Sequence, residues 1–218
     1  MVLDQLRPQT EKAFTPWAAR LNAWGVKPNS LSIASLFFAA FAALAFVFAM
    51  APGREWLLLV ASALVGLNAL ADGFDGRLAR LQGSASVKGD YLDHVIDRYA
   101  DLGVLTAIGL AGWVDLRITL FALLGTALTS YMGTQAQALG LGRNYRGLLA
   151  RADRIFILIT FPLLEFARLT WYPVEVPYVG TVLGIALLYI AVVGNLTAVQ
   201  RFWHGWREIT DREKGLLR

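Results

Sequence analysis

The feature that most limits how this 218-residue chain can fold is a series of stretches without a charged residue. Six such stretches cover residues 28–53, 56–71, 102–114, 118–142, 155–164 and 176–200. A helix of roughly 20 apolar residues spans the hydrocarbon core of a bilayer. A hydrophobic fraction of 56% and a mean hydropathy of +0.51 fit this reading. We therefore expect an all-α, polytopic membrane protein with six transmembrane helices.

Three of the six expected spans contain acidic residues. The second stretch ends at Asp72 and the third span begins near Tyr91, so both reach spanning length only if their helices continue through acidic residues. The fifth span, 155 to about 171, contains Pro162, which we expect to kink it, and Glu165. We therefore expect carboxylates inside two helices near one face of the membrane.

Basic residues are distributed unevenly between the two ends of these spans, which predicts the orientation in the membrane. Of 20 Lys and Arg residues, one side would hold sixteen and the other only Arg54, Arg117 and Arg168, with Arg98 inside a span. The richer side is expected to face the cytoplasm of a prokaryotic cell, with both termini and the acidic residues. This asymmetry also accounts for the net charge of +4, so we expect no nucleic-acid partner.

The chain is expected to form a single domain. Residues 1–27 mix apolar and charged residues and predict a juxtamembrane amphipathic helix at the membrane interface. Residues 28–200 would form the six-helix core, and residues 201–218 a cytoplasmic tail. The absence of cysteine excludes disulfides and thiolate chemistry.

Four aspartates are spaced so that they can share a site. Asp72 and Asp75 are three residues apart, and Gly89, Asp93 and Asp97 follow at intervals of four, so each set lies on one helix face. Two such faces joined by a short loop would bring four carboxylates together. With no cysteine and two histidines in the chain, oxygen ligation favours Mg²⁺, Mn²⁺ or Ca²⁺.

The residues around these aspartates match the pattern D-x2-D-G-x2-A-R-x8-G-x3-D-x3-D at every specified position. The chain thereby resembles the CDP-alcohol phosphotransferases. The resemblance implies transfer of a lipid-linked phosphate group from a CDP-lipid to a small alcohol, with CMP as the leaving group. It also implies two Mg²⁺ or Mn²⁺ ions bound by Asp72, Asp75, Asp93 and Asp97, with Asp97 as general base.

The same resemblance implies a CDP-binding set of small and polar residues. These are Asn29, Asp72, Gly76, Ala79, Arg80 and Gly89. The alternative for Gly76, Ala79 and Gly89 is close helix packing, and for Arg80 a topology-determining charge. Outside the pattern, Asp101 continues the Asp93–Asp97 stripe by one turn, and His94 fits an interfacial or packing histidine better than a metal ligand.

The acceptor alcohol is less well determined by the sequence. Residues 130–137 resemble a segment of the inositol-phosphate-using members, but Gly133 and Gln135 replace its Lys and Arg. Basic residues of the following segment would suit a phosphorylated acceptor, either glycerol phosphate or inositol phosphate. They are Arg143, Arg146, Arg151 and Arg154. A positive cytoplasmic loop is the alternative explanation.

Other functions remain open at this stage. An unphosphorylated acceptor such as serine or inositol would use the same chemistry. A divalent-cation transporter is a different class, since carboxylates inside a membrane also mark ion paths. A non-catalytic scaffold is a third, although no residue of the pattern is lost. Membrane lipids are expected to surround the protein, and a homodimer is possible.

Overall fold

The computed structural model of the protein describes residues 7–142 and 147–214. Seven α-helices make up nearly all of this part of the chain, which contains no strand apart from an isolated bridge between Val176 and Gly180. In chain order they are α1 Arg7–Ala23, α2 Pro28–Phe48, α3 Leu57–Leu81, α4 Val87–Leu110, α5 Leu116–Ala138, α6 Arg151–Trp171 and α7 Val182–Glu213. The expected all-α fold is confirmed.

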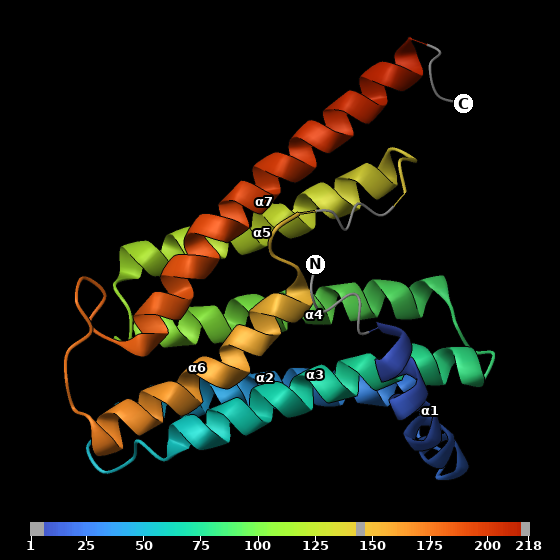
Figure 1. Ribbon diagram of the computed structural model, residues 1–218. Coiled ribbons are helices and arrows are strands. Elements are labelled where there is room, and N and C mark those ends of the chain that lie inside the picture. Colours follow the sequence, from blue (N-terminus) through green and yellow to red (C-terminus); the bar gives the residue numbers. More distant parts are fainter. Residues whose placement is uncertain (1–6, 143–146, 215–218) are drawn as a thin grey trace.

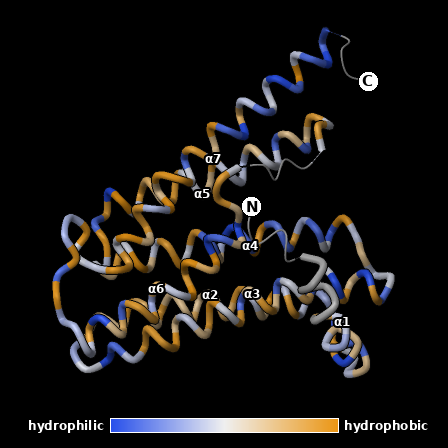
Figure 2. Tube along the Cα trace, in the orientation of Figure 1, coloured by the Kyte–Doolittle hydropathy of each residue, from blue (hydrophilic) through white to orange (hydrophobic). Residues whose placement is uncertain are grey.

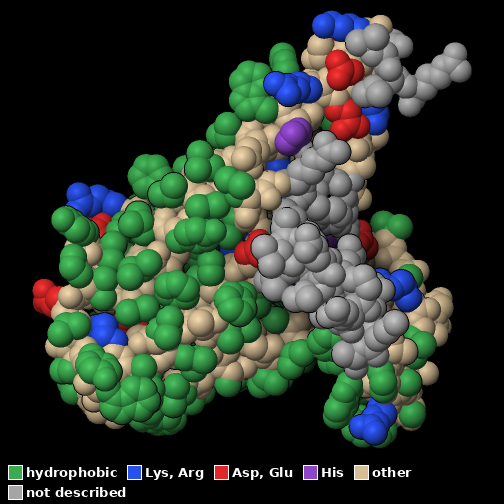
Figure 3. Space-filling view, in the orientation of Figure 1, with side chains coloured by type: hydrophobic (Ala, Val, Ile, Leu, Met, Phe, Trp, Pro, Cys, Tyr) green, Lys and Arg blue, Asp and Glu red, His purple; other side chains and the backbone are tan. Residues whose placement is uncertain are grey.

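Four of these helices, α2, α3, α5 and α7, are long and apolar enough to cross a membrane by length and composition. Large apolar side chains on them face outward, including Phe37, Phe41 and Phe121, each more than half exposed. Figure 2 shows apolar residues along the helices of the bundle, and Figure 3 shows apolar side chains over much of its visible surface. The chain is an integral membrane protein, while the count of six spans stays a prediction.

The helices run between two ends of an elongated bundle (Figure 1). Helix α2 packs against α3 and α4, α3 packs against α6, and α5 packs against α7; α4 and α6 contact α5 and α7, respectively. The connections 49–56, 111–115 and 172–181 lie at the left end of the view. The turn 82–86, helix α1 and the C-terminal ends of α5 and α7 lie toward the right.

Helices α5 and α7 approach closely at a pair of glycines. A Cβ atom on Gly125 would lie 2.8 Å from the backbone nitrogen of Asn195, and the Cβ of Gly194 would lie 3.5 Å from Gly125. The buried Thr129 hydroxyl donates to the Gly194 carbonyl at 3.0 Å across the same contact. Small residues thus allow backbone-to-backbone packing here, as in many membrane helix pairs.

Helix α1 lies against the end of α3 that carries the first two aspartates (Figure 1). The Phe14 ring packs edge-on against Phe74 with centroids 5.0 Å apart, and the Arg77 guanidinium carbon lies 4.7 Å from the Phe14 centroid. Gln82 also donates to the Val26 carbonyl at 2.9 Å. The helix within the expected 1–27 segment is therefore present, and its placement at a membrane interface stays a prediction.

Several helix ends differ from the limits of the charge-free stretches. Helix α2 begins with Pro28 at its first position, where the missing N–H costs no hydrogen bond, and ends at Phe48. Helix α6 continues through Pro162 to Trp171. Helix α7 begins at Val182 and extends to Glu213, so residues 201–213 continue the last helix. A stretch without charge indicates that its residues lie in apolar surroundings. Turns as well as helices can lie there, so the end of such a stretch need not be the end of a helix.

Candidate active site

The turn between α3 and α4 places the two halves of the aspartate pattern beside each other. Gly83, with φ +62°, lies in the turn after α3, and the Ser86 hydroxyl caps α4 by accepting from the Gly89 N–H at 3.1 Å. Helices α3 and α4 thus continue through the acidic residues, as the sequence predicts. Asp72 and Asp75 come from the end of α3, and Asp93 and Asp97 from the start of α4.

Asp72, Asp75 and Asp93 each offer a carboxylate oxygen within 4.8 Å of the other two. Asp75 is buried and the other two are half-buried. The Oδ1 atom of Asp93 is buried and has no hydrogen-bond partner among the described residues. A buried carboxylate oxygen needs a partner. A hard divalent cation would supply one, so these oxygens fit such an ion.

Asp75 is held in place by a residue that the sequence did not single out. The Ser32 hydroxyl of α2 donates to Asp75 Oδ2 at 2.5 Å, and both side chains are buried. Behind it, the Ser35 hydroxyl donates to the Ser32 carbonyl at 2.7 Å, and the Asn68 amide donates to the Ser35 carbonyl at 2.9 Å. This chain of hydrogen bonds connects α2 and α3 and holds Asp75 through its Oδ2 atom.

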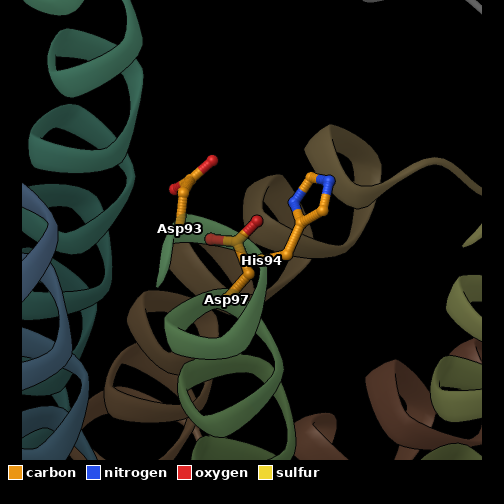
Figure 4. A group of neighbouring side chains, drawn as sticks. All are labelled: Asp93, His94 and Asp97. Atoms are coloured by element: carbon orange, nitrogen blue, oxygen red, sulfur yellow. The ribbon is translucent and has the colours of Figure 1, made fainter. Parts of the chain in front are cut away.

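Asp97 lies one turn beyond Asp93 on α4. Figure 4 shows the side chains of Asp93 and His94 on opposite sides of Asp97. Asp93, His94 and Asp97 form a second group whose possible ligand atoms lie within 4.8 Å of one another. His94 Nε2 also lies 4.0 Å from Asp90 Oδ2. His94 therefore lies beside the carboxylates of Asp90, Asp93 and Asp97, whereas the sequence favoured a packing role for it.

Arg151, at the start of α6, contacts the carboxylates of this site. Its Nη1 atom donates to Asp72 Oδ2 at 2.7 Å, and its Nη2 atom lies 2.6 Å from Asp97 Oδ1. The second contact is an ion pair without hydrogen-bond geometry, since neither Nη2 nor Asp97 Oδ1 has a hydrogen bond among the described residues. Arg151 therefore bridges carboxylates from both halves of the pattern.

A second, deeper group of charges adjoins Arg151. Asp101 accepts from Arg154 Nη2 at 3.0 Å and from Arg151 Nε at 3.4 Å, and Arg98 Nη2 lies 3.7 Å from it. Arg154 is buried, with 5% of its surface exposed. The sequence groups Arg151 with Arg154 and places Asp101 one turn deeper on the aspartate stripe, where it could pair with a buried polar group; in the structure that group is Arg154.

The position of Arg151 depends on the segment that precedes α6. The Leu149 N–H donates to the Thr197 hydroxyl of α7 at 3.0 Å, and Leu149 is buried. The Ala150 N–H donates to Asp153 at 2.9 Å, which fixes the first turn of α6. Helix α7 thus determines where α6 begins.

The remaining residues of the expected CDP-binding set border the same end of the bundle. The Arg80 guanidinium folds back along its own helix, because a Cβ on Gly76 would lie 3.6 Å from its Nη1 atom. A Cβ on Gly89 would lie 3.8 Å from Asn29 Oδ1, so Asn29 and Gly89 adjoin each other. Ala79 lies on the same turn of α3, half-buried. Arg143 and Arg146, two of the four expected acceptor arginines, lie outside the described residues.

The family model of the CDP-alcohol phosphatidyltransferases matches residues 26–197. The chain belongs to this family. The match covers α2 to the first half of α7, including every aspartate described above. This phosphatidyltransferase is therefore an enzyme, and the transporter and scaffold alternatives are not supported.

Relatives of this phosphatidyltransferase are named as synthases of inositol-phosphate lipids. The archaetidylinositol phosphate synthase of Pyrococcus horikoshii is 28% identical over 178 residues, which cover 80% of this chain and 89% of the relative. The phosphatidylinositol phosphate synthase of Streptomyces avermitilis is 31% identical over 196 residues, which cover 87% and 76%.

Solved structures of the phosphatidylinositol phosphate synthase of Mycobacterium tuberculosis have the same fold as this phosphatidyltransferase. The complex with manganese and citrate matches with a TM-score of 0.66 and 25% identity, covering 88% of each chain. The structure with CDP-DAG bound matches with a TM-score of 0.65 and 24% identity, covering 89% of this chain and 94% of the other.

Proposed function

We propose that this phosphatidyltransferase transfers a phosphatidyl-type group from a CDP-lipid, diacyl or ether-linked, to a phosphorylated alcohol and releases CMP. The observation that carries the proposal is the convergence of Asp72, Asp75, Asp93 and Asp97 at one end of the bundle. The manganese and the CDP-DAG of the Mycobacterium tuberculosis structures support a divalent cation and a CDP-lipid donor.

The proposed reaction replaces the phosphoanhydride bond of the CDP-lipid with a new phosphate ester. The acceptor hydroxyl oxygen forms a bond to the lipid-bearing phosphorus, and the bond from that phosphorus to the bridging oxygen breaks. CMP leaves with the bonding electron pair, and the hydroxyl proton passes to Asp97. Two Mg²⁺ or Mn²⁺ ions held by the four aspartates would offset the negative charge of the diphosphate and of the departing CMP.

Several residues would bind the donor without taking part in proton transfer. Asp72 would contribute to the CDP site as well as to the cations. Gly76, Ala79 and Gly89 offer little side-chain bulk, so a nucleotide can approach the backbone there. Arg80, exposed beside Gly76, can turn toward the diphosphate, and Asn29 adjoins Gly89.

A phosphorylated acceptor is favoured by the arginines at the start of α6. Arg151 and Arg154 lie together beside the carboxylates, and arginine binds phosphate through two parallel N–H groups. The names of the relatives favour inositol phosphate. Because Gly133 and Gln135 replace basic residues of the inositol-phosphate-using members, glycerol phosphate is the second candidate acceptor.

The proposed orientation places the acidic end of the bundle at the cytoplasmic face of a prokaryotic plasma membrane. Helices α4 and α6 would complete six spans, since α4 packs against α2 and α5, and α6 packs against α3 and α7. The uneven distribution of Lys and Arg supports this orientation. It gives CMP and the phosphorylated acceptor direct access from the compartment that contains them.

The test is product analysis with purified full-length protein, a CDP-lipid and Mn²⁺ or Mg²⁺. Parallel reactions contain inositol phosphate, glycerol phosphate, serine or inositol, and lipid products are identified by mass spectrometry. We expect product with a phosphorylated acceptor, CMP release in equal amount, and loss of both after chelation. Product from serine or unphosphorylated inositol alone would contradict the proposed acceptor, and turnover after exhaustive chelation would contradict the cation requirement.

A further inference from the structure

Asp101 is the centre of a buried group of charges that lies outside the family pattern. Its Oδ2 atom lies 3.0 Å from Arg154 Nη2 and 3.7 Å from Arg98 Nη2, and its Oδ1 atom lies 3.4 Å from Arg151 Nε. The carboxylate is 10% exposed. Three arginines thus surround one aspartate, and removal of that aspartate would leave buried positive charge without compensation.

Asp101 is the carboxylate that pairs with Arg154 in the described part of the chain. The Arg154 side chain is 6% exposed. The space beneath Asp101 is a cavity of about 10 Å³, lined also by Asn68, Ala100 and Ile155. This volume is on the order of one water molecule, so a guanidinium cannot relocate into it. Asp101 therefore determines the position of Arg154.

The guanidinium of Arg151 contacts two sets of carboxylates. Its Nη atoms contact Asp72 and Asp97, and its Nε atom contacts Asp101. Asp72 and Asp97 belong to the groups that can hold a cation, whereas Asp101 belongs to neither group. A cation and a guanidinium compete for the same oxygens because both are positive. Asp101 can keep its contact with Nε while that competition takes place.

We propose that Asp101 is the positioning residue for the acceptor phosphate. It holds Arg154 in place and retains Arg151 through Nε, while the Nη groups of Arg151 exchange from Asp72 and Asp97 to the acceptor. The inference rests on the proposed function, because it needs cations on the aspartates and a phosphorylated acceptor. Arg151 Nη2 lies 2.6 Å from Asp97 Oδ1 without hydrogen-bond geometry, so this ion pair is the contact that an acceptor phosphate would replace.

The first test compares steady-state kinetics of the wild type, Asp101→Asn and Asp101→Glu with inositol phosphate and glycerol phosphate as acceptors. In Asp101→Asn we expect the KM for the phosphorylated acceptor to rise about ten- to hundredfold, because charge-assisted contacts to phosphate become misplaced. The KM for the CDP-lipid should change less than about twofold, since the donor-binding residues keep their partners. Asp101→Glu retains the charge and should restore much of the acceptor affinity.

A matched control is Asp211→Asn, which neutralises a carboxylate on the projecting end of α7 and should alter neither KM. If Asp101→Asn does not fold, Asp101→Asn with Arg98→Gln removes a neighbouring positive charge that has no role in acceptor binding and should show the same loss of acceptor affinity. An acceptor KM at the wild-type value in either variant would overturn the proposal, as would equal increases in both KM values.

The second test measures the exchange of Arg151 without turnover. Mn²⁺ binding is followed by electron paramagnetic resonance in protein without donor or acceptor. Arg151→Gln should bind Mn²⁺ about three- to tenfold more tightly, because the competing guanidinium is gone. Unchanged or weaker binding would refute the exchange.

The two proposals can fail separately. A wild-type enzyme that uses only serine or inositol contradicts the proposed function. A wild-type enzyme that uses inositol phosphate, with an Asp101→Asn variant that retains its acceptor affinity, contradicts only the role of Asp101.

Discussion

Ser32 illustrates how a side chain outside the aspartate pattern can control one of its members. Its hydroxyl donates to Asp75 Oδ2 at 2.5 Å inside the bundle, where water does not compete for the bond. One carboxylate oxygen of Asp75 is thereby hydrogen-bonded to α2. The other oxygen is left for a cation, so the orientation of Asp75 depends on Ser32.

We predict that Ser32→Ala weakens the binding of the divalent cation. The loss of one charge-assisted hydrogen bond should raise the cation concentration needed for half-maximal activity about tenfold. The measurement is activity against Mg²⁺ or Mn²⁺ concentration at saturating substrates. Ser62→Ala is the control, since the buried Ser62 hydroxyl also bonds between helices, to the Ile159 carbonyl, and does not contact Asp75. Equal cation requirements in Ser32→Ala and the wild type would contradict the prediction.

The aspartates could be grouped from the sequence because their spacing alone places them on helix faces. The contacts of Ser32 and Asp101 could not be foreseen in the same way. Each joins residues from different helices, Ser32 with Asp75 and Asp101 with Arg154. Such pairs depend on how the helices pack, and a single sequence contains no direct signal for that packing.

The junction between the α5–α6 connection and α7 is the element that fixes the start of α6. The Leu149 N–H is buried and donates to the Thr197 hydroxyl, which in turn donates to the Val193 carbonyl at 2.7 Å. A Cβ on Gly147 would lie 2.3 Å from Thr197 Cγ2, and the glycine has φ +139°. Only a glycine fits this approach, so residues 147–149 lie close to α7.

We predict that Thr197→Val impairs both stability and acceptor binding. Valine keeps the shape but leaves the buried Leu149 N–H without an acceptor, which should cost about 1–3 kcal/mol. Because Arg151 follows directly, the KM for the acceptor should rise more than the KM for the CDP-lipid. Thermal unfolding in detergent and steady-state kinetics provide the measurements.

Thr170→Val provides the comparison for that prediction. The Thr170 hydroxyl is exposed and bonds to the Phe166 carbonyl of its own helix, so its loss should have little effect. If Thr197→Val and Thr170→Val behave alike, the connection does not position α6.

The residues at which helices begin and end could be predicted where charged residues interrupt apolar stretches. They were harder to predict in the charged segments outside those stretches. The extension of α3 and α4 through the aspartates followed from the length needed to span a bilayer. The continuation of α7 to Glu213 did not follow, because charged residues interrupt the apolar stretch from Arg201 onward and the segment still forms regular helix. Helix formation beyond the membrane depends on local hydrogen bonding, which hydropathy does not measure.

At the scale of the whole molecule, the end of the bundle opposite the aspartates is held by a buried ion pair. Glu165 is fully buried and pairs with Arg168 at 2.5 Å. Its other oxygen accepts from the Val182 N–H at 2.6 Å, and Arg168 donates to the Val174 carbonyl. These contacts join the end of α6, the connection 172–181 and the start of α7.

We predict that Glu165→Gln destabilises the protein without changing its substrate preference. Removing one partner leaves the Arg168 charge uncompensated, at a cost of about 3–5 kcal/mol. Both KM values should stay at the wild-type level, because the active site lies at the opposite end. Thermal unfolding in detergent measures the first effect, and kinetics below the unfolding temperature measure the second.

The double variant Glu165→Gln with Arg168→Gln removes both charges and should be more stable than the single variant. A single variant as stable as the wild type would show that this ion pair does not support the fold. A changed acceptor KM in the single variant would show that the two ends of the bundle are coupled.

The aspartates lie in the half of the bundle that carries the turn between α3 and α4. Under the proposed reaction, the acceptor and CMP exchange with water on that side, while the lipid tails of donor and product remain among lipids of the same leaflet. The enzyme then has no need to carry a head group through the bilayer. Newly made lipid would enter only the leaflet next to the aspartates, and its appearance in the opposite leaflet would require a separate lipid-translocating protein.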